Sequence, residues 1–480
     1  MRLFPLLLLR ISLLFVLAAS TPAGAHERLP DAVAQALRTA GIPTAAVAIV
    51  VQEATVGSQP QLSVNPASAL NPASVMKLVT TYAALELLGP AYTWKTEAWL
   101  QGSLQDGRLA GDLYFKGSGD PKLTFEQFWL LLRSLRARGL RDIQGDLVLD
   151  RSRFVTDDAA STFDDQPLRA YNVGPDALLL NFNTIRVQLL PQPEEQRLAA
   201  IAEPLPDKLD IVNLIRLANG DCGDWKEALR TDVTRRDGRT RLILSGSYPV
   251  SCGEHRWHLS MVPHAQYVLG VFRQLWTELG GTLTGDVHDA PVPAGARLAA
   301  TIESPTLAEI VRDINKYSNN VMARQLFLTI GAEAANKQWA TTADGDAAVR
   351  AWLTEKRLNF PELVLENGSG LSRRERISAA NLARLLAQAW ESPVMPELIA
   401  SLPLAAIDGT MKKRLGNSVA AGQAHIKTGS LEGVKAIAGY VRDRAGKWQI
   451  VVFLVNHANA RNAQAAQDAL LQWVYERGSR

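Results

Sequence analysis

The stretch LNPASVMK, residues 70–77, opens an apolar segment that runs to Leu88 and is ended by Gly89-Pro90. Asparagine is a favoured helix N-cap and proline fits the first helical position, so the pattern predicts a helix that begins near Pro72. Ser74 and Lys77 are three residues apart, which places both side chains on one face of the first turn. Backbone N–H groups in a first turn lack intrahelical partners, so the N–H of Ser74 is a candidate donor to an oxyanion.

Ser74 and Lys77 have the residue types of a nucleophile and its base. A serine hydroxyl is a weak nucleophile until a neighbouring group takes its proton. Lys77 can do so only when its amine is neutral, so its pKa must fall well below the usual value of about 10.4. Burial or a second cation nearby would lower it. Such pairs are also common in ordinary capped helices, so a catalytic interpretation depends on the remaining motifs.

A second cation is offered by Lys427-Thr428-Gly429, which lies far along the chain. The segment reads as a strand, and strand alternation puts Lys427 and Gly429 on one face. We expect Lys427 and Thr428 to hold a substrate carboxylate, and Gly429 to let a peptide backbone approach closely. The N–H of Ser430 is the expected second oxyanion donor. A peptide lying along this segment would bind as an added strand.

Between these two motifs lies Tyr317-Ser318-Asn319-Asn320, which can be read in two ways. Tyr317 and Asn319 give Y-x-N, whereas Ser318 and Asn320 give S-x-N. In the second reading, Ser318 passes a proton to the leaving amine and Asn320 orients the scissile amide. A helix cap rich in serine and asparagine is the structural alternative.

The three motifs in this order resemble those of class A β-lactamases and penicillin-binding proteins. The gap from Lys77 to Ser318 leaves room for one or two inserted domains. With that gap the chain resembles the D-alanyl-D-alanine carboxypeptidase/endopeptidase family, the class C low-molecular-mass penicillin-binding proteins. Further segments that carry the resemblance are GSGDP (117–121), GDLVLD (145–150), NGSGLSR (367–373) and DGTMKKR (408–414).

The resemblance implies a serine peptidase that attacks the carbonyl of a penultimate D-alanine in peptidoglycan peptides. It assigns the nucleophile to Ser74, the base to Lys77, the second serine to Ser318, and substrate binding to Asn320 and Lys427. It also implies acylation of Ser74 by β-lactams, carboxypeptidase or endopeptidase activity, and no cofactor. The alternatives are a β-lactamase and a non-catalytic module that binds cell-wall peptides.

Composition agrees with a globular protein of more than one domain. The chain has 480 residues, of which 47% are hydrophobic and 21% charged. A net charge of +3 is too small to indicate nucleic-acid binding.

The N-terminus predicts export. Arg2 is followed by a largely apolar run over residues 6–19 and by Ala23-Gly24-Ala25, an A-x-A cleavage site. We therefore expect residues 1–25 to be a signal peptide and the mature protein to be soluble in the periplasm. No later segment is long and apolar enough to predict a transmembrane anchor.

The two cysteines, Cys222 and Cys252, predict one disulfide, because an exported protein matures in an oxidising compartment. A zinc site that combines them with His255 and His258 is the alternative. The spacing favours the disulfide, and we expect no metal.

The pattern predicts an α+β fold: an antiparallel sheet flanked by helices, as in penicillin-binding proteins and β-lactamases, with β-rich domains inserted. Strands over residues 45–53 and 61–64 should pair with strands over 434–442 and 448–456. Helices are expected over 29–40, 265–280 and 458–480, and a hairpin turn at Asp237-Gly238. The expected domains are an acyl-transferase domain (26–91 and 299–480), a middle domain (92–179 and 249–298) and a nested domain (180–248).

Overall fold

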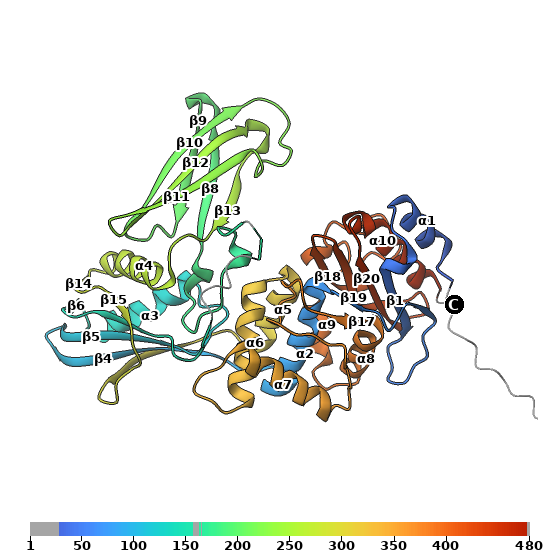
Figure 1. The fold of residues 1–480 in the computed structure, drawn as a ribbon. Coiled ribbons are helices and arrows are strands. Elements are labelled where there is room, and N and C mark those ends of the chain that lie inside the picture. Colours follow the sequence, from blue (N-terminus) through green and yellow to red (C-terminus); the bar gives the residue numbers. More distant parts are fainter. Residues whose placement is uncertain (1–27, 157–162, 165, 478–480) are drawn as a thin grey trace, which may run out of the picture.

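The computed structural model describes residues 28–156, 163–164 and 166–477. The expected signal peptide lies outside these residues. The described chain forms three units: a terminal unit built from both ends of the chain, a middle unit, and a nested unit that projects from the middle one (Figure 1).

The sheet of the terminal unit is antiparallel and joins the two ends of the chain. Its strands, in spatial order, are β18 (Ala424–Leu431), β19 (Val434–Arg442), β20 (Trp448–Asn456), β1 (Val47–Glu53) and β2 (Leu62–Val64). The predicted strand pairing is confirmed, because β1 pairs with both β2 and β20, and β20 pairs with β19. Strand β18 pairs only with β19 in this sheet and is one of its two edge strands.

Both faces of this sheet are covered by helices. In β1, Ala48 and Val50 pack into one hydrophobic cluster while Val47, Ile49 and Val51 pack into another. This alternation explains why the strand is apolar at successive positions. One face meets α1 (Asp31–Thr39) and α10 (Gln464–Arg477). The other face meets a helical layer formed by α2 (Lys77–Leu88), α5 (Leu307–Tyr317), α6 (Asn320–Ala334), α7 (Thr342–Glu355), α8 (Ala379–Trp390) and α9 (Met395–Ser401).

Helix α2 lies at the centre of that layer. Every residue from Lys77 to Leu85 is buried, so the helix is enclosed rather than amphipathic. Lys77 is thereby carried into the interior at the junction of helices and sheet.

The middle unit is a mixed sheet of seven strands covered by α3 (Phe125–Ala137) and α4 (His264–Glu278). Its strands are β4 (Lys95–Gln105), β5 (Arg108–Gly117), β6 (Asp142–Ile143), β7 (Leu147–Asp150), β14 (Thr282–Leu283), β15 (Val287–Asp289) and β16 (Arg297–Glu303). The pairs β5–β7 and β7–β15 are parallel, whereas β4–β5 and β4–β16 are antiparallel.

The nested unit consists of two three-stranded sheets. One contains β9 (Arg197–Glu203), β8 (Ile185–Gln192) and β13 (His255–Leu259), and the other contains β10 (Leu209–Ala218), β12 (Arg239–Pro249) and β11 (Leu229–Arg236). The predicted hairpin turn is confirmed: Asp237 and Gly238 have φ of 52° and 71° between β11 and β12. Cys222 and Cys252 are joined by a disulfide in this unit, with Cα atoms 4.7 Å apart.

Strand pairing suggests different domain boundaries from those expected. Strand β13 pairs with β8, and β16 pairs with β4. We therefore propose that the nested unit extends to about residue 259 and the middle unit to about 303. The two units share one hydrophobic cluster, which contains Leu113 and Phe128 as well as Leu242 and Tyr248. The nested unit thus packs on the middle unit rather than forming a separate core.

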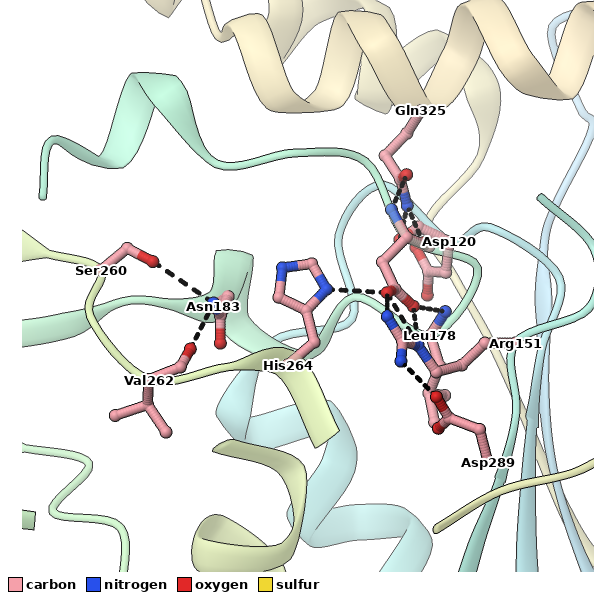
Figure 2. A network of polar contacts seen from close by, with 10 residues as sticks. Asp120, Arg151, Leu178, Asn183, Ser260, Val262, His264, Asp289 and Gln325 are labelled. Atoms are coloured by element: carbon pink, nitrogen blue, oxygen red, sulfur yellow. Dashed lines mark hydrogen bonds and ion pairs between the residues drawn. The ribbon is translucent and has the colours of Figure 1, made fainter. Parts of the chain in front are cut away.

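A network around Asp176 joins the units (Figure 2). Its buried carboxylate accepts from Arg151 Nε at 2.8 Å and pairs with His264 Nδ1 at 2.7 Å. Its backbone N–H donates to Gln325 Oε1 of α6 at 2.8 Å, and Gln325 Nε2 donates to the Asp176 carbonyl at 2.7 Å. Burial alone would raise the pKa of Asp176, but the hydrogen bonds from His264 and Arg151 hold it below its usual value. The carboxylate of Asp176 therefore binds within the middle unit, while its backbone contacts α6.

The helix predicted over residues 458–480 begins later than expected, and its last three residues lie outside the described ranges. A 3₁₀ turn, Ala460–Ala463, precedes α10. Within the described ranges, no helix has both the length and the hydropathy that crossing a bilayer requires.

Candidate active site

The first motif adopts a tighter turn than predicted. Residues Ala73–Met76 form a 3₁₀ helix, and the α-helix begins only at Lys77. Ala73 has a left-handed backbone with φ of 48°, so the expected α-helical start at Pro72 is wrong. Asn71 still caps this turn, since its Oδ1 accepts from Ala73 N at 2.8 Å. A 3₁₀ helix has about three residues per turn, so Ser74 and Lys77 are stacked directly above one another.

Lys77 has the contacts of a base that shares a proton with Ser74. It is 0% exposed, and its Nζ lies 2.9 Å from Ser74 Oγ. Nζ also contacts Asn320 Oδ1 at 2.6 Å and the Ser369 carbonyl oxygen. A neutral amine has two N–H groups and one lone pair. The Asn320 and Ser369 oxygens accept the two N–H groups, which leaves the lone pair for the hydroxyl of Ser74.

The surroundings of Lys77 favour its neutral form. Burial is the main cause that lowers its pKa well below the usual value, and the charge of Lys427 lowers it further. Glu375, which is also buried, acts in the opposite direction. The second cation that the sequence suggested is therefore in place, but burial has the larger effect.

The structure distinguishes the two readings of the middle motif. Tyr317 is 72% exposed, and Asn319 caps α6 by accepting from Met322 N at 3.1 Å. Ser318 ends α5 with φ of 56° and accepts from Lys427 Nζ at 2.9 Å. Asn320 contacts Lys77, as described above. Ser318 and Asn320 therefore lie in the site, which matches the S-x-N reading.

The third motif lies on the edge strand β18. Lys427 is 0% exposed, and its Nζ donates to Ser318 Oγ and to the Thr428 carbonyl at 2.8 Å. Burial lowers the pKa of Lys427 to about 7. Thr428 is half-buried and Ser430 is exposed. The side chains of Lys427 and Ser318 link the second motif directly to the third.

Gly429 lies against the backbone of the first motif. A Cβ at this position would lie 2.6 Å from the carbonyl oxygen of Pro72 and 3.1 Å from Ser74 N. The backbone that approaches Gly429 is thus the chain's own nucleophile turn. Gly370, with φ of 79°, faces the same turn, and a Cβ there would collide with the Ala73 carbonyl.

The segment 366–372 has a role in the site that the sequence did not show. Asn367 Oδ1 accepts from Ser369 N at 3.0 Å, and Thr80 Oγ1 donates to the Gly368 carbonyl at 2.7 Å. Glu375 Oε1 accepts from the N–H groups of Glu366 and Asn367, both at 3.1 Å. These bonds hold the Ser369 carbonyl against Lys77. The quoted NGSG motif was the only signal, and a backbone carbonyl cannot be recognised from a residue type.

Three of the four residues of the zinc alternative have other partners. His255 Nδ1 lies 2.9 Å from the Tyr248 hydroxyl, and both cysteines belong to the disulfide. Among the residues that the structure describes, no three His, Cys, Asp or Glu side chains are grouped to hold a metal ion.

A serine stacked on a buried lysine, with a second serine and a second lysine beside them, defines a serine acyl-transfer site of the S-x-x-K class. The chain belongs to the D-Ala-D-Ala carboxypeptidase 3 (S13) family, whose sequence model matches residues 29–476. This confirms the resemblance drawn from the motifs and the prediction of a serine-type D-Ala-D-Ala peptidase.

Two curated relatives are similar over most of their length. The D-alanyl-D-alanine carboxypeptidase of Actinomadura sp. (strain R39) is 30% identical over 418 residues, which cover 84% of this chain and 76% of the relative. The D-alanyl-D-alanine carboxypeptidase DacB of Haemophilus influenzae is 26% identical over 393 residues, 80% of each chain.

A solved structure confirms the predicted α+β fold with inserted domains. Penicillin binding protein 4 (dacB) from Haemophilus influenzae matches with a TM-score of 0.76 at 23% identity, covering 92% of this chain and 99% of that chain. A second structure of that protein, complexed with a β-lactam, matches with a TM-score of 0.73 at 23% identity and the same coverage.

Proposed function

We propose that this protein hydrolyses D-alanyl-D-alanine peptides of peptidoglycan through an acyl-enzyme on Ser74. The observation that carries the proposal is the contact of 2.9 Å between Ser74 Oγ and the buried Nζ of Lys77. Two carbonyl oxygens accept the two N–H groups of the neutral amine, so its lone pair can accept the hydroxyl proton. No histidine is needed for this step.

Acylation would proceed in two proton transfers. Ser74 Oγ bonds to the carbonyl carbon of the penultimate D-alanine while its proton moves to Lys77 Nζ. The N–H groups of Ser74 and Ser430 stabilise the oxyanion. The C–N bond then breaks, and the proton held by Lys77 passes through Ser318 to the departing amine, which returns Lys77 to its neutral form. Water attacks the resulting ester while Lys77 takes one of its protons. The C–Oγ bond then breaks, and this proton returns to Ser74 Oγ.

Lys427 and Thr428 would bind the terminal carboxylate of the substrate. The pKa of Lys427 is lowered to about 7 because the amine is buried. A bound carboxylate would favour its charged form. The hydroxyl of the half-buried Thr428 adds a neutral donor beside this charge.

A cavity lies next to the segment that holds Lys77. It has a volume of about 1100 Å³, and Glu366, Asn367 and Leu371 form part of its lining. These residues belong to the segment that holds Lys77, whereas the side chains of the three motifs are not among the lining residues. We propose that terminal D-alanyl bonds, cross-linked ones, or both are cleaved.

Purified muropeptides test this function. Mass analysis of the products should show loss of D-alanine from pentapeptides and, for endopeptidase activity, monomers from dimers. Ser74→Ala should abolish both and Lys77→Ala should reduce both severely, because one loses the nucleophile and the other its base. Retained turnover in either variant would contradict the mechanism.

Fluorescent penicillin separates the alternatives. We expect stable labelling of the wild type and none of Ser74→Ala. Steady hydrolysis of a chromogenic cephalosporin without a stable adduct would indicate a β-lactamase. A wild-type protein that is neither labelled nor active would indicate a non-catalytic peptide-binding module.

We also propose that the protein is exported, cleaved near Ala25 and active in the periplasm. The A-x-A sequence at residues 23–25 and the family membership support this location. Mass measurement of the N-terminus of the mature protein tests it.

A further inference from the structure

The turn that follows α9 brings an additional hydroxyl to the third motif. Thr410 lies in a 3₁₀ turn, Gly409–Met411, and its Oγ1 is 2.7 Å from Thr428 Oγ1. This is the ordinary distance of a hydrogen bond between two hydroxyl groups. Thr410 is exposed, so it has no role in a hydrophobic core.

The position of Thr410 is set by its neighbours on both sides. Asp408 pairs with the buried Nζ of Lys316 at 2.7 Å, and its Oδ1 accepts from Leu404 N at 2.8 Å. Met411 is 0% exposed and packs into the core of the terminal unit. The turn is thus anchored before and after Thr410, and the hydroxyl is held against β18.

The ion pair of Asp408 with Lys316 also connects this turn to the second motif. Lys316 stands two residues before Ser318, and its Nζ also donates to the Leu402 carbonyl at 2.6 Å. Gly409, with φ of 54°, passes so close to this helix that a Cβ would lie 2.6 Å from the Lys316 carbonyl oxygen. The turn carrying Thr410 is therefore fastened to the end of α5 while it contacts the third motif.

We propose that Thr410 is a positioning residue that orients the hydroxyl of Thr428 toward the terminal carboxylate of the substrate. This inference rests on the carboxylate-binding role proposed for Thr428. To donate to a carboxylate, Thr428 must direct its hydrogen away from Thr410. In the structure Thr428 Oγ1 donates to Thr410 Oγ1, and a bound carboxylate would reverse these roles, so that Thr410 becomes the donor and Thr428 the acceptor. A hydroxyl that accepts one hydrogen bond is polarised and becomes a better donor in the next.

The test compares two substrates that differ only in the terminal group: a peptide ending in D-alanyl-D-alanine and its carboxamide. Thr410→Val keeps the shape of the side chain and removes the hydroxyl. We expect KM for the carboxylate peptide to rise about 3- to 10-fold with little change in kcat, the loss of one neutral hydrogen bond. The carboxamide peptide should be affected less, so the preference for a carboxylate should fall.

Further variants distinguish positioning from a structural effect. Thr410→Ser retains the hydroxyl and should restore KM. Ser418→Ala removes a hydroxyl from the same segment, where it faces Gln472 at 3.3 Å, and should leave KM unchanged. Thermal unfolding of all variants identifies any loss of folding. Thr410→Val added to Thr428→Val should cause no further loss, because the two hydroxyls act as one unit.

The results separate this inference from the proposed function. If Thr428→Val raises KM while Thr410→Val does not, the positioning role is wrong and the carboxylate site stands. If the effects of the two substitutions are additive, or equal for both substrates, the positioning role is also wrong. If neither substitution changes KM, the carboxylate role of Thr428 fails as well.

Discussion

The amine of Lys77 contacts three oxygen atoms, which belong to Ser74, Asn320 and Ser369. In the proposed mechanism, Asn320 and Ser369 accept the N–H groups of the amine and Ser74 gives it a proton. Lys427 would act in its charged form instead. The proposed mechanism therefore requires two buried lysines in different protonation states.

The two lysines predict a pH profile for kcat/KM. In the proposed mechanism Lys77 acts when neutral, so activity should rise as the pH passes upward through its lowered pKa. Lys427 would bind a carboxylate when protonated, and burial lowers its pKa to about 7, so activity should fall as the pH rises above that value. Steady-state kinetics with the carboxylate peptide should show this alkaline decline. The carboxamide peptide is the control, and an equal decline with both peptides would contradict the role of Lys427.

At the scale of elements, the nucleophile turn is enclosed by backbone. The segment 366–372 passes on one side and strand β18 on the other, and both approach through a glycine. Ala73 is held in a left-handed conformation between them. Such a conformation persists only where surrounding structure determines it. The geometry of Ser74 therefore depends on its own turn and on two segments distant in sequence, 366–372 and β18.

Gly370→Ala tests this dependence. The new Cβ would meet the Ala73 carbonyl, and the backbone at Gly370 has φ of 79°, so either the segment or the nucleophile turn must move. We expect a loss of about 1–3 kcal/mol in the free energy of unfolding, measured by denaturant titration, and slower acylation by penicillin. Gly416→Ala is the matched control, because nothing lies within 4 Å of its Cβ position. Normal acylation in Gly370→Ala would show that the turn is not confined in this way.

For the whole molecule, helix α6 is the connection between the inserted units and the site. It begins with Asn320 at Lys77, and one and a half turns later Gln325 bonds to Asp176. Figure 2 shows Gln325 and Asp120 on the same side of the network, and Gln325 Nε2 lies 3.5 Å from the Asp120 carbonyl. The GSGDP segment that marked the family resemblance is therefore part of the contact between the middle unit and α6.

Asp120 predicts how this contact depends on pH. Asp120 is 4% exposed, and burial raises the pKa of its carboxyl to about 7. In the unfolded chain the pKa of this carboxyl is near 4. The protonated form therefore contributes its full stability below about pH 4, and this contribution is lost as the pH rises through 7. Asp120→Asn removes the charge and should be more stable than wild type at pH 8, by an amount on the order of 4 kcal/mol.

Denaturant titrations at pH 5 and pH 8 measure this difference. The stabilisation by Asp120→Asn should be small at pH 5 and large at pH 8. Asp106→Asn, an exposed position in the β4–β5 turn, is the matched control and should show no such pH dependence. Equal stabilisation at both pH values would contradict a buried, protonated Asp120.

Several side chains of the site could be predicted, because residue types and their spacing are enough to identify them. A serine and a lysine three residues apart, a later serine and asparagine, and a strand lysine are recognisable side chains. The sheet of the terminal unit was predictable for a similar reason, since its strands are apolar on both faces. Ser369 and Thr410 were not predictable. One acts through its carbonyl, and the other depends on a turn whose place is set by Asp408 and Met411.

The sequence by itself determined the family, the α+β class and the side chains able to perform acyl transfer, because these depend on local pattern and on the order of motifs. Only the tertiary structure decided which of two readings of residues 317–320 faces the site, which backbone meets Gly429, and how Lys77 is surrounded. Those properties arise from contacts between segments separated by more than two hundred residues, such as Lys77 with Asn320 and with Ser369. Burial and backbone approach exist only once the chain has folded, and they determine the protonation state on which the chemistry depends.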